Sequence, residues 1–168
     1  MQIIFIGDDR ENIDNIDPDI NHYSNNVVDF GQYSTDSFIR DIQNDQNSLN
    51  IFHNNARSIM SDGRLDKYEA YLNHINNPFH ILAFSETWLT NNSKHLCQFE
   101  GFLSEHLLRP TDGQFDFKTR GGGVSMFIKK GIEYKYRNDL SKVTPVIECL
   151  FIELYYNTDV KTFCDTIN

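Results

Sequence analysis

Two polar side chains follow predicted strands in the first part of the chain, and both are of types that bind metal ions or phosphates. Glu86 comes two positions after the apolar run 79–84, which has the length of a buried strand. In open α/β sheets, ligands bind at the carboxyl ends of the strands. A carboxylate there can hold a divalent cation, because Mg²⁺ is often bound by one or two carboxylates with water and substrate phosphate. Alternatively, Glu86 accepts hydrogen bonds from backbone in the following turn.

Asn55 belongs to the polar pair Asn54-Asn55, which ends another predicted strand, residues 49–53. If that strand is parallel to the run 79–84, Asn55 lies at the same sheet edge as Glu86. An amide there can orient a phosphate or a second carboxylate, since it both donates and accepts hydrogen bonds. Asn is also a common turn residue, and that alternative stays open.

The glycine run 121–123 does not fit a phosphate-binding loop of the P-loop type. Such a loop leads from a strand into a helix and carries a Lys and a Ser or Thr, whereas this run leads into a predicted strand. A bulge or a close backbone contact explains it better. Lys118 and Arg120, just before the run, are candidates for contacts to a nucleic-acid backbone, with ordinary surface charge as the alternative.

The histidines and cysteines show no recognisable metal or catalytic pattern. His95 and Cys97 are two positions apart, but no second pair follows at zinc-finger spacing, and neither HExxH nor GxSxG occurs. The three cysteines contain no CxxC, so no disulfide framework is indicated and a reducing, intracellular compartment is expected. Trp88 is the only tryptophan, and we expect it to pack in the core or at its rim.

A strand–helix–strand unit is predicted to position Asn55 and Glu86. The first strand covers residues 49–53 and the second is the run 79–84. Between them, Ser61 or Asp62 is positioned to cap a helix. Apolar residues follow at helical spacing: Leu65, Tyr68, Leu72 and Ile75. The two strands of such a βαβ unit are parallel neighbours in one sheet.

The rest of the chain is predicted to be mostly β, with glycines between the strands. The expected strands cover residues 102–108, 124–129, 133–137, 147–154 and 160–164. We therefore expect an α/β domain over residues 48–168.

Residues 1–47 form an acidic, asparagine-rich leader. Ten of the 24 acidic and two of the 15 basic residues lie in residues 1–50, a net charge of −8, which leaves −1 for residues 51–168. We expect a short helix near residues 36–42 and otherwise loose order, with the charge on a solvated surface. The near-neutral remainder neither supports nor excludes a nucleic-acid partner.

Targeting signals are not evident in the sequence. The apolar run at the amino terminus, residues 3–6, has four residues, fewer than the ~7–15 of a signal peptide. Nothing approaches the ~20 apolar residues of a membrane span. We expect an intracellular protein without a membrane partner.

Taken in order, these motifs resemble the opening of the endonuclease–exonuclease–phosphatase superfamily (DNase I-like). The nearest variant is the endonuclease domain at the amino end of non-LTR retrotransposon polyproteins, where N-x-R-S is followed about 30 residues later by S/T-E-T-W-L. The matching segments are 51–59 (IFHNNARSI), 82–89 (LAFSETWL), 121–128 (GGGVSMFI) and 148–153 (ECLFIE).

The resemblance implies a fold and a chemistry. The family fold is a two-sheet α/β sandwich with outer helices, of which this chain would form the N-terminal half, starting with the βαβ unit. Its members cleave phosphate esters with Mg²⁺ or Mn²⁺, so DNA is the implied partner and the nucleus an implied location. Glu86 matches the family's metal-binding glutamate and Asn55 its active-site asparagine.

Three later motifs of the family are missing from the sequence. The 168 residues contain no Y-x-P-type turn, G-D-F-N or S-D-H segment, which supply the phosphate-contacting Tyr, the water-activating Asp and the general-base His. Without them we expect no hydrolysis by this chain alone. We also expect an open apolar face on the first sheet, which the missing C-terminal half or a partner must cover.

Three hypotheses remain: an inactive endonuclease domain, a non-catalytic binding module on the same scaffold, or a piece of an active protein cut by a reading-frame error. Reading the nucleotide sequence past codon 168 in three frames separates the last from the others.

Overall fold

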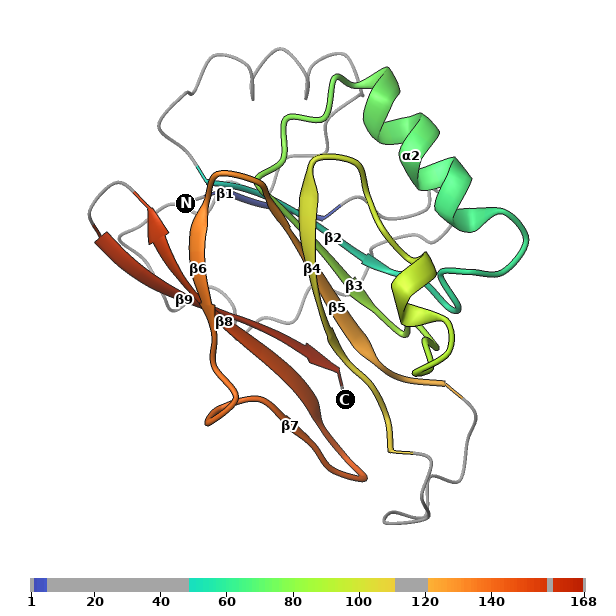
Figure 1. The fold of residues 1–168 in the computed structure, drawn as a ribbon, viewed down its shortest axis with the longest axis vertical. Helices are drawn as coiled ribbons and strands as arrows, with labels where there is room; N and C mark the ends of the chain where they lie inside the picture. The colour runs from blue at the N-terminus through green and yellow to red at the C-terminus, as the bar shows by residue number, and fades with distance from the viewer. Residues whose placement is uncertain (1, 6–48, 111–120, 157–158, 168) are drawn as a thin grey trace, which may run out of the picture.

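A five-stranded sheet carries the predicted βαβ unit. The computed structural model describes residues 2–5, 49–110, 121–156 and 159–167. The strand order of this sheet is β1 (Gln2–Phe5), β2 (Asn50–Asn55), β3 (Ile81–Ser85), β5 (Val124–Lys129) and β4 (Phe102–Leu107). The first three strands are parallel, and β5 is antiparallel to both β3 and β4 (Figure 1). Helix α2 (Arg64–His74) joins β2 to β3, which confirms the βαβ prediction.

A second sheet is built around its long strand β8 (Glu148–Tyr156). Strands β6 (Glu133–Tyr136) and β7 (Lys142–Val143) pair with different parts of β8, and β9 (Asp159–Ile167) also pairs with it, all antiparallel. Besides α2, the described residues contain a short 3₁₀ helix, η2 (Lys94–Leu96). The described chain is therefore mixed α/β, with two sheets and few helices.

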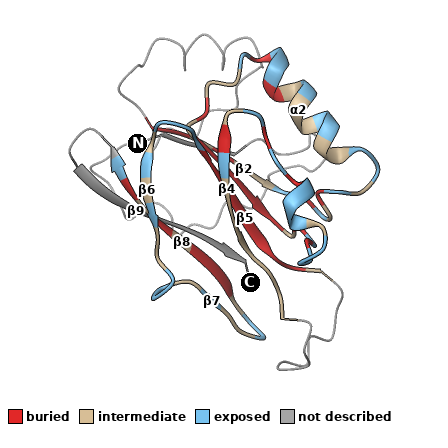
Figure 2. Ribbon diagram, in the orientation of Figure 1, coloured by how far each residue is buried: buried red, intermediate tan, exposed pale blue. Residues whose placement is uncertain are grey.

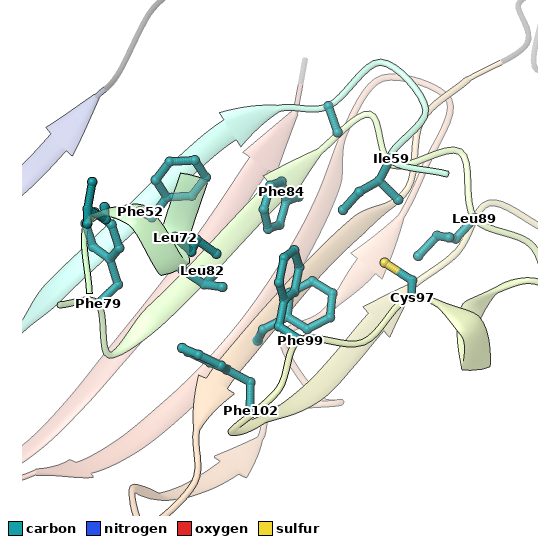
Figure 3. Close-up of a cluster of buried hydrophobic side chains, with 13 residues drawn as sticks. Phe52, Ile59, Leu72, Phe79, Leu82, Phe84, Leu89, Cys97, Phe99 and Phe102 are labelled. Atoms are coloured by element: carbon teal, nitrogen blue, oxygen red, sulfur yellow. The ribbon is translucent and has the colours of Figure 1, made fainter. Parts of the chain in front are cut away.

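Strand β3 is buried on both faces, as its continuous apolar sequence predicts. Side chains alternate across a strand, so Leu82 and Phe84 belong to one core cluster and Ile81 and Ala83 to another. In the first cluster, the Phe84 ring stacks on Phe99 with centroids 5.6 Å apart (Figure 3). The apolar side of α2 covers this cluster with Leu72 and, partly buried, Leu65, Tyr68 and Tyr71.

The second core cluster joins the two sheets. Ile81 and Ala83 of β3 share it with alternate residues of β5 (Val124, Met126 and Ile128) and of β8 (Leu150, Ile152 and Leu154). Buried residues are accordingly prominent on β5 and β8 (Figure 2). We expected the first sheet to have an open apolar face. At these positions the expectation is wrong, because apolar side chains of β8 cover the face.

The start of α2 differs from the sequence prediction. Helix α2 begins at Arg64 after Gly63, whose φ of 65° is left-handed, and no side chain caps it, so neither Ser61 nor Asp62 is the cap. The Ser61 hydroxyl instead donates to the carbonyl of Ser58 at 3.1 Å in the preceding turn.

Part of the predicted leader belongs to the sheet. Residues 2–5 form β1, in parallel register with β2 from Gln2 opposite Asn50 to Phe5 opposite His53. The apolar run IIF within β1 is typical of a strand. It was not predicted as one because the acidic residues that follow it placed it in the leader. The helix expected near residues 36–42 lies outside the described residues.

Candidate functional site

The candidate site lies where β2 and β3 end at the same sheet edge. Asn55 is opposite Ser85 in the parallel register. The two chains stay together beyond the strands: the Ser58 N–H donates to the Glu86 carbonyl at 2.8 Å, and the Ile59 N–H to the Thr87 carbonyl at 3.1 Å. The topology therefore brings Asn55 and Glu86 to one edge, as the βαβ unit predicts.

Two hydrogen bonds orient the Glu86 carboxylate. Its Oε2 accepts from the indole Nε1–H of Trp88 and from the backbone N–H of Gly122, both at 2.8 Å. The residue is partly exposed, and its φ of 52° is left-handed. Glu86 does accept a backbone N–H, as the alternative explanation required. The donor, however, lies 36 residues away in the glycine run rather than in the next turn.

The glycine run lies directly against the segment that carries Glu86. The backbone N–H of Thr87 donates to the Gly123 carbonyl at 3.0 Å, and that of Trp88 to the Gly122 carbonyl at 2.8 Å. All three glycines have φ between 81° and 137°. A Cβ at Gly121 would lie 2.8 Å from both Glu86 Oε2 and Trp88 Nε1. The run is thus a close backbone contact that leads into β5, which confirms the sequence interpretation and excludes a P-loop.

Glu148 is a second acidic residue at this place, and no motif in the sequence predicted it. It is 2% exposed; its Oε2 accepts the backbone N–H of Gly123 at 2.6 Å, and its Oε1 pairs with Nε of Arg109. A buried carboxylate is tolerated when it is paired and hydrogen-bonded in this way. The available signal was a glutamate at the start of the otherwise apolar run ECLFI.

Asn55 behaves as a turn residue in this structure. It is exposed, and its Oδ1 accepts the backbone N–H of Arg57 at 3.3 Å, a local bond typical of Asn in turns. The hydrogen bonds of the described residues include none between the side chains of Asn55 and Glu86. Its neighbour Asn54 accepts from the Tyr68 hydroxyl at 2.7 Å, which ties the end of β2 to α2.

The remaining candidates are of two kinds. Lys118 and Arg120 lie outside the described residues. His95 and Cys97 belong to the η2 turn, where Cys97 is buried; burial, with a smaller effect from the Glu69 carboxylate, raises the pKa of its thiol to about 12. Such a thiol stays protonated at neutral pH and does not favour a metal ion.

Glu86 is the described carboxylate at this edge that could hold a divalent cation. The described part of the chain holds no group of three His, Cys, Asp or Glu side chains suited to a metal ion. Glu148 is engaged by Arg109 and Gly123, which leaves the partly exposed Glu86 carboxylate as the available charge. A single oriented carboxylate, completed by water and phosphate oxygens, is a donor set that Mg²⁺ accepts.

Comparison with known proteins adds no family assignment. No protein-family model matches the chain, and no curated protein matches it. In the parts of the chain that the structure describes, no helix has the length and apolar character needed to span a membrane.

Proposed function

We propose that this chain carries the first part of a metal-dependent phosphodiesterase domain, of the DNA-cleaving kind found in non-LTR retrotransposons. In this proposal the two sheets stack as an α/β sandwich with α2 on its outside. The support is the apolar cluster shared by β3, β5 and β8, and the packing of α2 on the opposite face of β3.

The observation that carries the proposal is the held carboxylate of Glu86. Trp88 and Gly122 fix its Oε2 at the carboxyl edge of a parallel strand pair, where α/β proteins bind ligands. A bound Mg²⁺ or Mn²⁺ would polarise a phosphate oxygen and stabilise charge on the displaced oxygen. In the proposal Glu86 holds the cation, and the amide NH₂ of Asn55, at the same edge, donates to a phosphate while its Oδ1 keeps the bond to the Arg57 N–H.

This assignment predicts binding without hydrolysis. The chain lacks the G-D-F-N and S-D-H segments that activate water in the related enzymes. General-base catalysis contributes roughly 10²–10⁴-fold. The 168-residue chain should therefore leave supercoiled plasmid intact in Mg²⁺, and robust nicking that Glu86→Ala abolishes would contradict the proposed inactivity.

The metal site can be tested through the single tryptophan. Nε1 of Trp88 lies 2.8 Å from Glu86 Oε2, so paramagnetic Mn²⁺ bound at Glu86 would quench its fluorescence. We expect saturable quenching, displaced by Mg²⁺. Glu86→Gln, which keeps an acceptor oxygen but loses the charge, should weaken the Mn²⁺ affinity at least about tenfold. Glu100→Gln, at an exposed residue before β4, is the matched control and should titrate like the wild type. Equal quenching in all three proteins would refute the assignment of Glu86.

A further inference from the structure

Two consecutive backbone N–H groups of the glycine run hold two carboxylates from different sheets. The N–H of Gly122 donates to Glu86, which follows β3 of the five-stranded sheet, at 2.8 Å. The N–H of Gly123 donates to Glu148, which begins β8 of the second sheet, at 2.6 Å. The glycine run therefore connects the candidate metal-binding carboxylate to a buried carboxylate of the second sheet.

Glu148 is fixed more firmly than Glu86. It is almost wholly buried, and its two oxygens are divided between the Arg109 guanidinium and the Gly123 N–H. Charge-assisted hydrogen bonds of this kind are about twice as strong as neutral ones, and burial strengthens them further. Glu148 and Arg109 thus form a rigid support on one side of the glycine run.

The glycine backbone has no free space against that support. A Cβ on Gly122 would collide with the Arg109 guanidinium and lie 2.5 Å from Glu148 Oε1. On the other side, the carbonyls of Gly122 and Gly123 accept from the backbone of Trp88 and Thr87. A displacement of Glu148 would therefore move the Gly122 N–H and, with it, the donor that orients Glu86.

We propose that Glu148 is a positioning residue for the Glu86 site, acting through Gly123 and Gly122 without contacting the metal ion. The inference rests on the proposed function for its metal, although the positioning itself is testable without one. Partners that orient a metal ligand from outside typically contribute 10–100-fold to metal affinity. Removing the Glu148 carboxylate should weaken Mn²⁺ binding by that order, although the residue lies on the far side of the glycine backbone.

The first experiment reads the position of Glu86 directly. With ¹⁵N-labelled tryptophan, the chain gives one indole N–H cross-peak, that of Trp88, whose proton is donated to Glu86. Glu148→Ala should move or broaden this cross-peak. Glu148→Met combined with Arg109→Met removes the pair without leaving a buried unpaired charge, and keeps the test valid if Glu148→Ala does not fold. An indole cross-peak at the wild-type position in a folded Glu148 variant would overturn the inference.

The matched control is another hydrogen bond between the sheets. The Tyr134 hydroxyl of β6 donates to Glu105 of β4 at 2.9 Å, away from the glycine run. Tyr134→Phe removes this bond with little change in shape and should leave both the indole cross-peak and the Mn²⁺ affinity as in the wild type. An equal shift of the cross-peak in Tyr134→Phe would show that any lost contact between the sheets moves Trp88. The effect of Glu148 would then be general and structural, and the proposal would be overturned.

The metal titration separates the two proposals. If Glu148→Ala raises the Mn²⁺ dissociation constant 10–100-fold in the Trp88 quenching assay, both the metal site at Glu86 and the positioning role of Glu148 are supported. If wild-type fluorescence is not quenched at all, the proposed metal site fails, and the indole cross-peak alone decides whether Glu148 positions Glu86.

Discussion

The indole N–H of Trp88 donates to the carboxylate of Glu86 over 2.8 Å, and both residues have a left-handed backbone, with φ of 55° and 52°. Such conformations cost roughly 1–2 kcal/mol for a residue with a side chain. They persist where the surroundings impose them, and they are concentrated at functional sites. Here the glycine run imposes them, because it accepts backbone hydrogen bonds from Thr87 and Trp88 and donates one to Glu86.

Trp88→Phe should separate the hydrogen bond from the aromatic packing. The substitution keeps an apolar ring but removes the N–H that holds Glu86. Since Trp88 is 37% exposed, we expect a stability loss of only about 1 kcal/mol, below the roughly 1.5–3 kcal/mol of hydrogen bonds to charged groups. Urea unfolding followed by circular dichroism measures it. Leu96→Ala, at a more exposed apolar residue, should change the free energy of unfolding by less than about 0.5 kcal/mol.

Gly122→Ala should be far more destabilising than Gly101→Ala. The two glycines have nearly the same φ, 81° and 82°, so an alanine meets the same backbone strain, about 1 kcal/mol, at both positions. A Cβ at Gly101 meets nothing within 4 Å, whereas one at Gly122 collides with Arg109 and Glu148. We expect a total loss of about 3 kcal/mol or more at Gly122. Equal losses in urea unfolding would show that the glycine run is not packed as described.

Ile152→Ala tests whether the second sheet shares the core of the first. Ile152 is fully buried on β8 in the cluster that contains Ile81 and Met126. Truncating a buried isoleucine costs about 2–5 kcal/mol. Val146→Ala is the control at a residue that is 71% exposed, and it should cost less than about 0.5 kcal/mol. If Ile152→Ala lowers the free energy of unfolding no more than the control does, the cluster between the sheets is not formed in solution. That result would support the open sheet face expected from the sequence.

The sequence predicted what depends on local pattern and on strand topology. The apolar run 79–84 predicted β3 and its two covered faces, and parallel pairing placed Asn55 and Glu86 at one edge. The partners of Glu86 were beyond this reasoning. Gly122 is 36 residues away, and its contact depends on how β5 returns beside β3.

The partners of Glu148 could not be recognised from the sequence for a similar reason. They are Arg109, 39 residues away after β4, and Gly123, 25 residues away before β5. The predicted cap of α2 was wrong for a local reason. The Ser61 hydroxyl donates to the carbonyl of Ser58 in its own turn and therefore does not cap the helix. The expectation of an open sheet face was wrong because the pattern of residues 147–154 predicted a buried strand but did not show which strands it would pack against.

His106 should make the stability of the chain depend on pH. Its Nδ1 lies 2.8 Å from the hydroxyl of the fully buried Ser125, and its buried Nε2 has no hydrogen-bond partner among the described residues. Burial, aided by the nearby charge of Lys94, lowers the pKa of the ring from 6.5 to about 4. The folded state therefore holds His106 neutral, while the unfolded chain takes up a proton once the pH falls below about 6.5.

The sign follows from this difference in bound protons. Because the unfolded chain binds more protons between pH 6.5 and 4, the free energy of unfolding falls as the pH is lowered through that range. The contribution of His106 is complete above pH 6.5 and lost below pH 4, and its size is at most about 3 kcal/mol. In His106→Asn, which keeps a polar group near Ser125 but does not titrate, the free energy of unfolding should depend less steeply on pH. His80, whose pKa is lowered by burial and by Lys129, is present in both proteins, so its contribution cancels in the comparison. Urea unfolding at pH 7, 6, 5 and 4.5 measures the two slopes, and parallel slopes would show that His106 titrates alike in the folded and unfolded chain.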